Sequence, residues 1–208
     1  MVDNGVAGKY NSARSALCAG LISMLLMSMW TGMAMALDRG TVAPEFSLPV
    51  LVNASDAQRA QAEQESVHFA VLNLSDYRGR VVYLDFWDSS CLPCRESLPM
   101  LSRLREEFAR DDVEIVAVNT DSNPNDALSF LAEHPVSYPV VSDPAATTVE
   151  AYGSTALPSA YFIARDGTIH GKHQGFKASD IARIRSQLTA LSDSDTYHDT
   201  YEENRGYK

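Results

Sequence analysis

Residues 81–94 read VVYLDFWDSSCLPC, and this stretch decides the fold. Its first half, residues 81–87, is almost continuously apolar and rich in β-branched and aromatic residues, which is typical of a central strand buried on both faces. From Cys91 onward the pattern changes to that of an amphipathic helix. Apolar residues now recur at every third or fourth position, at Leu98, Leu101, Leu104 and Phe108. The sequence therefore predicts a Cys-Leu-Pro-Cys motif at the junction of a buried strand and a helix.

The motif favours redox chemistry at Cys91 and Cys94. Residues three apart on a first helical turn share a face, so the two sulfurs can meet. The free N–H groups and the dipole of a helix N-terminus lower the pKa of a thiol there and populate the nucleophilic thiolate. Pro93 suits this turn because its missing N–H costs little. The alternatives are a structural disulfide, although so short a loop gains little from closure, or half of a zinc site, although zinc takes four ligands.

The rest of the chain alternates strand and helix patterns. Further strands are predicted at residues 43–49, 71–74, 113–118, 140–141, 160–163 and 168–170, the first of them at a sheet edge because it contains prolines. Further helices are predicted at residues 124–134, 147–152 and 181–191. Asp166 and Gly167 mark a tight hairpin turn. This order of elements indicates an α/β fold with a central mixed β-sheet flanked by helices.

Residues 1–36 have the layout of an export segment. Lys9 and Arg14 precede the uncharged residues 15–37, and residues 34–36 read Ala-Met-Ala, as in a secretory signal peptide cleaved after Ala36. The uncharged residues are also numerous enough to span a bilayer, so the alternative is an uncleaved membrane anchor. Both interpretations place the remainder of the chain in the periplasm.

The 208 residues carry a formal net charge of -10, and Lys and Arg form no basic face, which excludes nucleic acid as a partner. We predict a single folded domain at residues 37–191. Residues 192–208 are polar and acidic, and we predict a disordered tail there. Cys18 lies within the export segment, so only Cys91 and Cys94 remain in the exported part, too few for a disulfide-rich scaffold.

The chain resembles thioredoxin-like proteins, in particular the TlpA/ResA group of exported thiol–disulfide oxidoreductases. The resemblance covers residues 43–191 and rests on the VYLDFW strand, the Cys-Leu-Pro-Cys-Arg-Glu motif, Pro99, the strand at 113–118, and Leu157-Pro158 ahead of the strand at 160–163. It implies a thioredoxin-like fold and no cofactor. It also implies that Cys91 attacks a substrate disulfide and that Cys94 resolves the mixed disulfide.

The same resemblance assigns further site residues. Asp85 matches a buried acid beneath the resolving cysteine, where burial raises its pKa and lets it exchange a proton with Cys94, although an ordinary polar residue at a strand end is the alternative. Pro158 matches a proline held in cis opposite the cysteines, although an ordinary edge-strand proline is the alternative. If the bond is cis, the backbone of Leu157 would pair with an incoming peptide strand. The predicted substrate-binding surface consists of Leu157, Pro158, Pro93 and Trp87.

Three positions depart from the family pattern. Ser90 stands where a tryptophan usually precedes the first cysteine, which removes an apolar flank of the docking surface. A frequent glutamate is replaced by Ser97, and Glu96 cannot substitute because one residue on a helix turns the side chain by about 100°. Leu157 replaces a threonine or valine. The catalytic pair is retained, so the changes concern the choice of substrate.

The resemblance implies a reductant that receives electrons from a membrane donor of the DsbD/CcdA type. Its substrates would be envelope proteins with cysteine pairs, apocytochrome c among them. One alternative is a peroxiredoxin-like thiol peroxidase, but neither cysteine lies in a P-x-x-x-T-x-x-C arrangement. The other alternative is a copper-binding assembly chaperone that uses the two cysteines as ligands. No histidine is convincingly placed to complete such a site, and we predict no metal.

Overall fold

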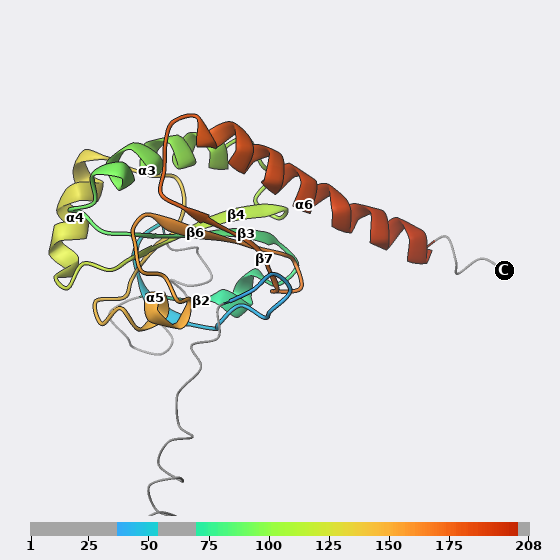
Figure 1. Ribbon diagram of the computed structural model, residues 1–208, viewed down its shortest axis with the longest axis horizontal. Helices are drawn as coiled ribbons and strands as arrows, with labels where there is room; N and C mark the ends of the chain where they lie inside the picture. Colours follow the sequence, from blue (N-terminus) through green and yellow to red (C-terminus); the bar gives the residue numbers. More distant parts are fainter. Residues whose placement is uncertain (1–36, 54–69, 204–208) are drawn as a thin grey trace, which may run out of the picture. The chain divides into compact units, whose positions relative to one another are not determined.

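The computed structural model describes residues 37–53 and 70–203 (Figure 1). The predicted export segment at residues 1–36, with Cys18, lies outside the described residues. Among the residues that are described, no helix is both long enough and apolar enough to cross a membrane.

A seven-stranded mixed sheet forms the centre of the fold, in the order β2-β1-β5-β4-β3-β6-β7. The strands are β1 (Ser47–Val52), β2 (Val71–Asn73), β3 (Val81–Trp87), β4 (Val113–Asn119), β5 (Val140–Ser142), β6 (Ser159–Ile163) and β7 (Ile169–Gln174). Strands β3, β4 and β5 are parallel, whereas β6 runs antiparallel to β3, and β1 runs antiparallel to β5. The predicted α/β class and thioredoxin-like fold are confirmed.

Strand β3 lies inside the sheet between β4 and β6, and all seven of its residues are buried. Side chains alternate between the faces of a strand. Val81, Tyr83 and Trp87 therefore pack on one face, in the same cluster as side chains of the helices α3 (Leu92–Arg105), α4 (Pro124–Glu133) and α6 (Asp180–Glu203). Val82, Leu84 and Phe86 pack on the other face, which the 3-10 helix η2 (Leu74–Tyr77) and α5 (Thr147–Ala151) cover.

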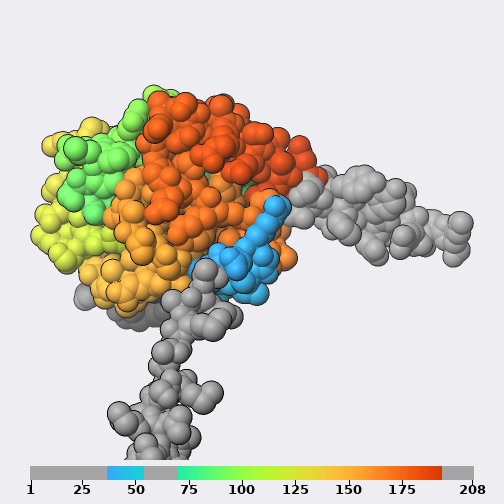
Figure 2. Space-filling view, viewed as in Figure 1, coloured from blue at the N-terminus to red at the C-terminus, as the bar shows by residue number. Residues whose placement is uncertain are grey.

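The helices begin where the sequence predicts. Cys91 is the N-cap of α3 and Pro93 lies in its first turn. Asn123 caps α4 by accepting a hydrogen bond from the backbone of Asn125, and Pro124 takes the first helical position. Helices α3 and α6 are neighbours on one face of the sheet (Figures 1 and 2).

Two elements differ from the predicted ones. The first strand is β1 at Ser47–Val52, and it lies between β2 and β5 instead of at an edge. Pro49 is tolerated there because the short β5 pairs only with Val50 and Val52. Helix α6 does not end at Leu191 but continues to Glu203, since residues 192–203 contain no Gly or Pro that would end it. The rest of the predicted disordered tail, residues 204–208, lies outside the described residues.

Candidate active site

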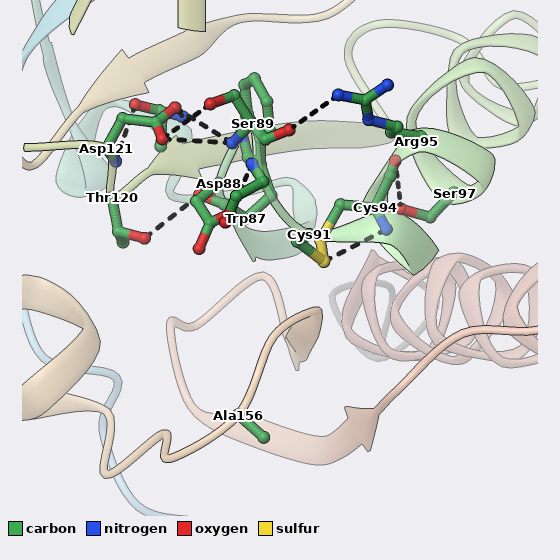
Figure 3. Close-up of a disulfide and its surroundings, with 12 residues drawn as sticks. Trp87, Asp88, Ser89, Cys91, Cys94, Arg95, Ser97, Thr120, Asp121 and Ala156 are labelled. Carbon is green, nitrogen blue, oxygen red and sulfur yellow. Dashed lines mark hydrogen bonds between the residues drawn. A yellow bond between two sulfur atoms is a disulfide. The ribbon is translucent and has the colours of Figure 1, made fainter. Parts of the chain in front are cut away.

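The two cysteines of the motif form a disulfide at the first turn of α3, just beyond the end of β3 (Figure 3). Their Cα atoms are 5.2 Å apart and their sulfurs are bonded at 2.01 Å. The backbone N–H of Cys94 donates to Sγ of Cys91 over 3.2 Å. The strand-to-helix junction predicted from the sequence therefore brings the two sulfurs together.

The two sulfurs differ in accessibility. Cys94 is fully buried in the core cluster beneath α3. Cys91 is half-buried and lines an open groove on the surface. Leu92 and Pro93, which separate the cysteines, are both exposed. Another protein can therefore reach Cys91, but it cannot reach Cys94.

The groove has a volume of about 480 Å³ and follows the junctions after β3 and β4 and the loop before β6. It is lined by Asp88, Cys91, Pro93, Thr120, Ala146, Val149, Ser154, Thr155, Ala156 and Leu157. In Figure 3, Asp88, Thr120 and Cys91 lie along one side and Ala156 along the other. The groove thus holds the reachable sulfur of the pair and both Pro93 and Leu157 from the predicted substrate-binding set.

The bond between Leu157 and Pro158 is cis, as the family pattern predicts. Pro158 is buried, and its carbonyl accepts a hydrogen bond of 2.8 Å from Gly175. Leu157 is half-buried at the groove. Of these two neighbours, Leu157 is therefore the one that faces the groove.

Trp87 is a correction to the predicted site. Its side chain is fully buried, packed against Phe130 with ring centroids 5.3 Å apart, so it cannot contact a substrate. The reason is its place in β3. The side chains of Trp87 and Tyr83 lie on the same face of β3, and α3, α4 and α6 cover that face. Because both faces of β3 are buried, the sequence does not indicate which of them lies nearer the groove. Trp87 supports the core beneath α3 instead.

Asp85 is buried in the middle of the sheet with only 2% of its surface exposed. Its neighbours in register are Ala117 on β4 and Ala160 on β6, and its Oδ2 has no hydrogen-bond partner among the residues that the structure describes. Burial penalises the charged form and raises the pKa of Asp85 to about 8. Asp85 lies two residues before Trp87 on β3, so both side chains are on the same face of the sheet. This is the face that α3 covers and on which Cys94 is buried.

Sequence reasoning missed a polar network in the loop between β3 and α3. Oδ1 of Asp88 accepts hydrogen bonds from the backbone N–H of Ser90 over 2.8 Å and from its hydroxyl over 2.7 Å. Likewise, the carboxylate of Asp121 accepts hydrogen bonds from the backbone N–H and the hydroxyl of Ser89. The signal in the sequence was the pattern Asp-Ser-Ser immediately before Cys91, in which short polar side chains bond to neighbouring backbone.

The described residues contain no group of three or more His, Cys, Asp or Glu side chains placed to hold an ion. Ser97, at the position of the family's frequent glutamate, is buried and donates to the carbonyl of Cys94 over 3.2 Å.

A thioredoxin fold with a half-buried cysteine bonded to a buried one at a helix N-terminus defines a thiol–disulfide oxidoreductase. Residues 40–172 match the model of the AhpC/TSA family, and the chain belongs to that family. ResA thiol-disulfide oxidoreductase of Oceanobacillus iheyensis is 31% identical over 153 residues, which are 74% of this chain and 72% of the relative. ResA of Halalkalibacterium halodurans is 30% identical over 128 residues, 58% of this chain and 73% of the relative.

A solved structure of similar fold comes from Chlorobium tepidum and is described as a thiol:disulfide interchange protein DsbE. It superposes with a TM-score of 0.65 at 35% identity, over 75% of this chain and 99% of its own. The resemblance to the ResA group drawn from the sequence is therefore confirmed, and so is the enzyme class.

Proposed function

We propose that this enzyme reduces disulfides in proteins outside the cytoplasm, with Cys91 as the attacking thiol and Cys94 as the resolving thiol. The observation that carries the assignment is the difference in burial between the two sulfurs. Cys91 opens on a groove about 480 Å³ in volume, whereas Cys94 is sealed beneath α3. A target disulfide can therefore meet one sulfur only.

The exchange proceeds in two displacements. In the reduced enzyme the thiolate of Cys91 attacks one sulfur of the target disulfide, a mixed disulfide forms, and the other target sulfur leaves as a thiolate and takes a proton. Cys94 then loses its proton and attacks Sγ of Cys91. The bond between Cys91 and Cys94 forms, the second target thiolate departs, and two electrons have passed from the enzyme to the target.

Asp85 is our candidate for the group that takes the proton of Cys94. The enzyme described here is in the disulfide state, and a carboxyl whose pKa is about 8 holds a proton at neutral pH. That is the state expected once the proton of Cys94 has been transferred. Burial favours the protonated form of this carboxyl, and its Oδ2 has no hydrogen-bond partner among the described residues, so the carboxyl can receive a proton.

The location and the electron supply are part of the proposal. Residues 1–36 would export the chain as a cleaved signal peptide or hold it as an anchor, and residues 37–191 would act in the periplasm. A membrane donor of the DsbD/CcdA type would restore the dithiol, because each turnover leaves the pair oxidised. Apocytochrome c cysteines are the target we favour, because the resemblance to the TlpA/ResA group implies envelope proteins with cysteine pairs as substrates.

Trapping in cells tests this function. Cys94→Ser leaves Cys91 able to attack but removes the resolving thiol, so mixed disulfides should accumulate on Cys91 and disappear on treatment with dithiothreitol. Cys91→Ser is the matched control and should trap nothing. Identification of the trapped proteins names the targets. Absence of any thiol-reversible adduct on the Cys94→Ser variant would overturn the proposal.

A further inference from the structure

The groove beside Cys91 contains a single charged side chain. Of its ten lining residues in the described part of the chain, only Asp88 carries a carboxylate, and none carries a basic group. Every other lining side chain apart from Cys91 is apolar or bears a hydroxyl. A segment that docks here therefore meets one fixed negative charge in an otherwise neutral groove.

Asp88 is held in place by the residue that departs from the family pattern. Both hydrogen bonds from Ser90 go to Oδ1 of Asp88. Oδ2 has no hydrogen-bond partner within residues 37–53 and 70–203. Where the resemblance leads us to expect an apolar tryptophan, this chain has a serine that orients a carboxylate. The flank of the docking surface has changed from apolar to anionic.

Within residues 37–53 and 70–203, no Lys, Arg or His forms an ion pair with this carboxylate. Arg95 is the basic residue that follows the motif, but its guanidinium donates to the carbonyl of Ser89 over 3.5 Å and lies 5.6 Å from the ring centroid of Phe130. A docking segment that covers Asp88 without offering a positive charge would leave a carboxylate partly desolvated and unpaired, which is unfavourable. An acidic segment would also be repelled.

We infer that Asp88 selects target segments that carry a lysine or arginine beside the cysteine that Cys91 attacks. This inference rests on the proposed function and deepens it, because it names the chemistry of the substrate. The occupant of the groove is an extended segment of another protein, with its apolar side chains against Leu157 and Val149 and its basic side chain at Asp88. The net charge of -10 adds to the attraction of a basic target.

Matched disulfide peptides test the inference on the full-length chain, purified in mild detergent and reduced beforehand. Each peptide contains two cysteines in an intramolecular disulfide, and one flanking residue is Lys, Gln or Glu. One series varies the residue before the first cysteine, and a second series varies the residue after the last. Acid quenching and chromatography give the second-order rate constant for reduction of each peptide.

The ratio of the Lys to the Glu rate constant is the decisive quantity, because changes in the intrinsic reactivity of Cys91 cancel in it. In at least one series we expect a ratio of about tenfold, falling as salt is added. Asp88→Asn keeps an acceptor for Ser90 but removes the charge, so the ratio should fall most of the way to one, and only the small preference caused by the net charge of the chain should remain. Asp111→Asn is the matched control: Asp111 is exposed, precedes β4 at the opposite end of the sheet, and its loss should leave the ratio unchanged.

The outcomes separate this inference from the proposed function. If all peptides in both series are reduced at similar rates by the wild-type enzyme, the role of Asp88 is overturned while the reductase function stands. The same conclusion follows if Asp88→Asn retains the wild-type ratio. If no peptide is reduced, the proposed function and the inference fall together.

Discussion

The backbone N–H of Cys94 points at Sγ of Cys91 and donates to it over 3.2 Å. The first turn of α3 thus supplies a hydrogen-bond donor to the sulfur that lines the groove, while its partner sulfur is sealed in the core. A hydrogen-bond donor and the dipole of a helix N-terminus both stabilise negative charge on a nearby sulfur, which here is that of Cys91. The fold therefore separates a reachable cysteine, on whose sulfur negative charge is stabilised, from a protected one.

This separation predicts selective alkylation of the reduced enzyme. Iodoacetamide at neutral pH should modify Cys91 at least about tenfold faster than Cys94, since the latter is fully buried. Peptide mapping by mass spectrometry after timed quenching gives both rates. In the denatured chain the two rates should converge, and equal rates in the folded enzyme would contradict the assignment of the attacking thiol.

Asp85 should make the stability of the disulfide form depend on pH. Its pKa is raised from 3.8 to about 8 by burial, so between these values the folded state keeps a proton that the unfolded state has lost. The contribution of Asp85 to the free energy of unfolding is therefore fully present below pH 4 and is lost as the pH rises toward 8. The loss is a few kcal/mol, with about 5 kcal/mol as the upper limit.

Comparison with Asp85→Asn isolates this contribution. Denaturant unfolding at intervals from pH 4 to 8, under non-reducing conditions, gives the free energy of unfolding for both proteins. The Asn variant should gain stability relative to wild type as the pH rises, because its side chain does not titrate. Two curves that run parallel across this range would show that Asp85 is not the buried titrating group.

The same substitution should slow the second displacement of the catalytic cycle. If Asp85 accepts the proton of Cys94, its loss leaves the mixed disulfide on Cys91 unresolved for longer, by about a hundredfold or more. Rapid acid quenching during reduction of a peptide disulfide measures the lifetime of the mixed disulfide. The rate of the first attack by Cys91 should change far less, and equal slowing of both steps would point to a structural effect instead.

The sequence predicts those parts of the site that depend on local patterns. A continuous apolar strand followed by a helical period places Cys91 and Cys94 at a helix N-terminus, and the cis bond at Pro158 follows from the family position. Orientation is harder to predict. Trp87 belongs to a strand buried on both faces, where alternation gives no polar face from which to judge the direction of a side chain.

Asp88 was missed for a different reason. Its importance depends on the groove, which is formed by segments that are far apart in the sequence, at residues 88–93, 120, 146–149 and 154–157. No periodicity links these segments. The end of α6 was misplaced because residues 192–203 are polar enough to suggest disorder, yet contain nothing that stops a helix. Long-range assembly therefore sets the limit of prediction from this sequence.

A buried ion pair anchors the C-terminal end of α3, the helix that begins after Cys91. Arg105, the last residue of α3, pairs through Nε and Nη2 with the carboxylate of Glu114 on β4, and their side chains are 3% and 5% exposed. Both side chains make a further hydrogen bond. Arg105 donates to the carbonyl of Phe108 over 3.0 Å, and Glu114 accepts from the backbone N–H of Ile115 over 3.0 Å. Removal of one partner would leave the other charge buried.

Glu114→Gln should therefore lower the free energy of unfolding by about 3 kcal/mol or more, as measured by denaturant titration. Replacing both partners by apolar residues, Arg105→Met with Glu114→Leu, should recover most of that loss because no charge stays buried. The exposed pair of Glu107 and Arg185, with contacts of 2.6 and 2.7 Å, is the matched control. Glu107→Gln should cost less than about 1 kcal/mol because solvent screens that pair. If Glu114→Gln and Glu107→Gln lower the free energy of unfolding by similar amounts, the end of α3 relaxes when the buried pair is broken. In that case the pair does not fix α3 on the sheet.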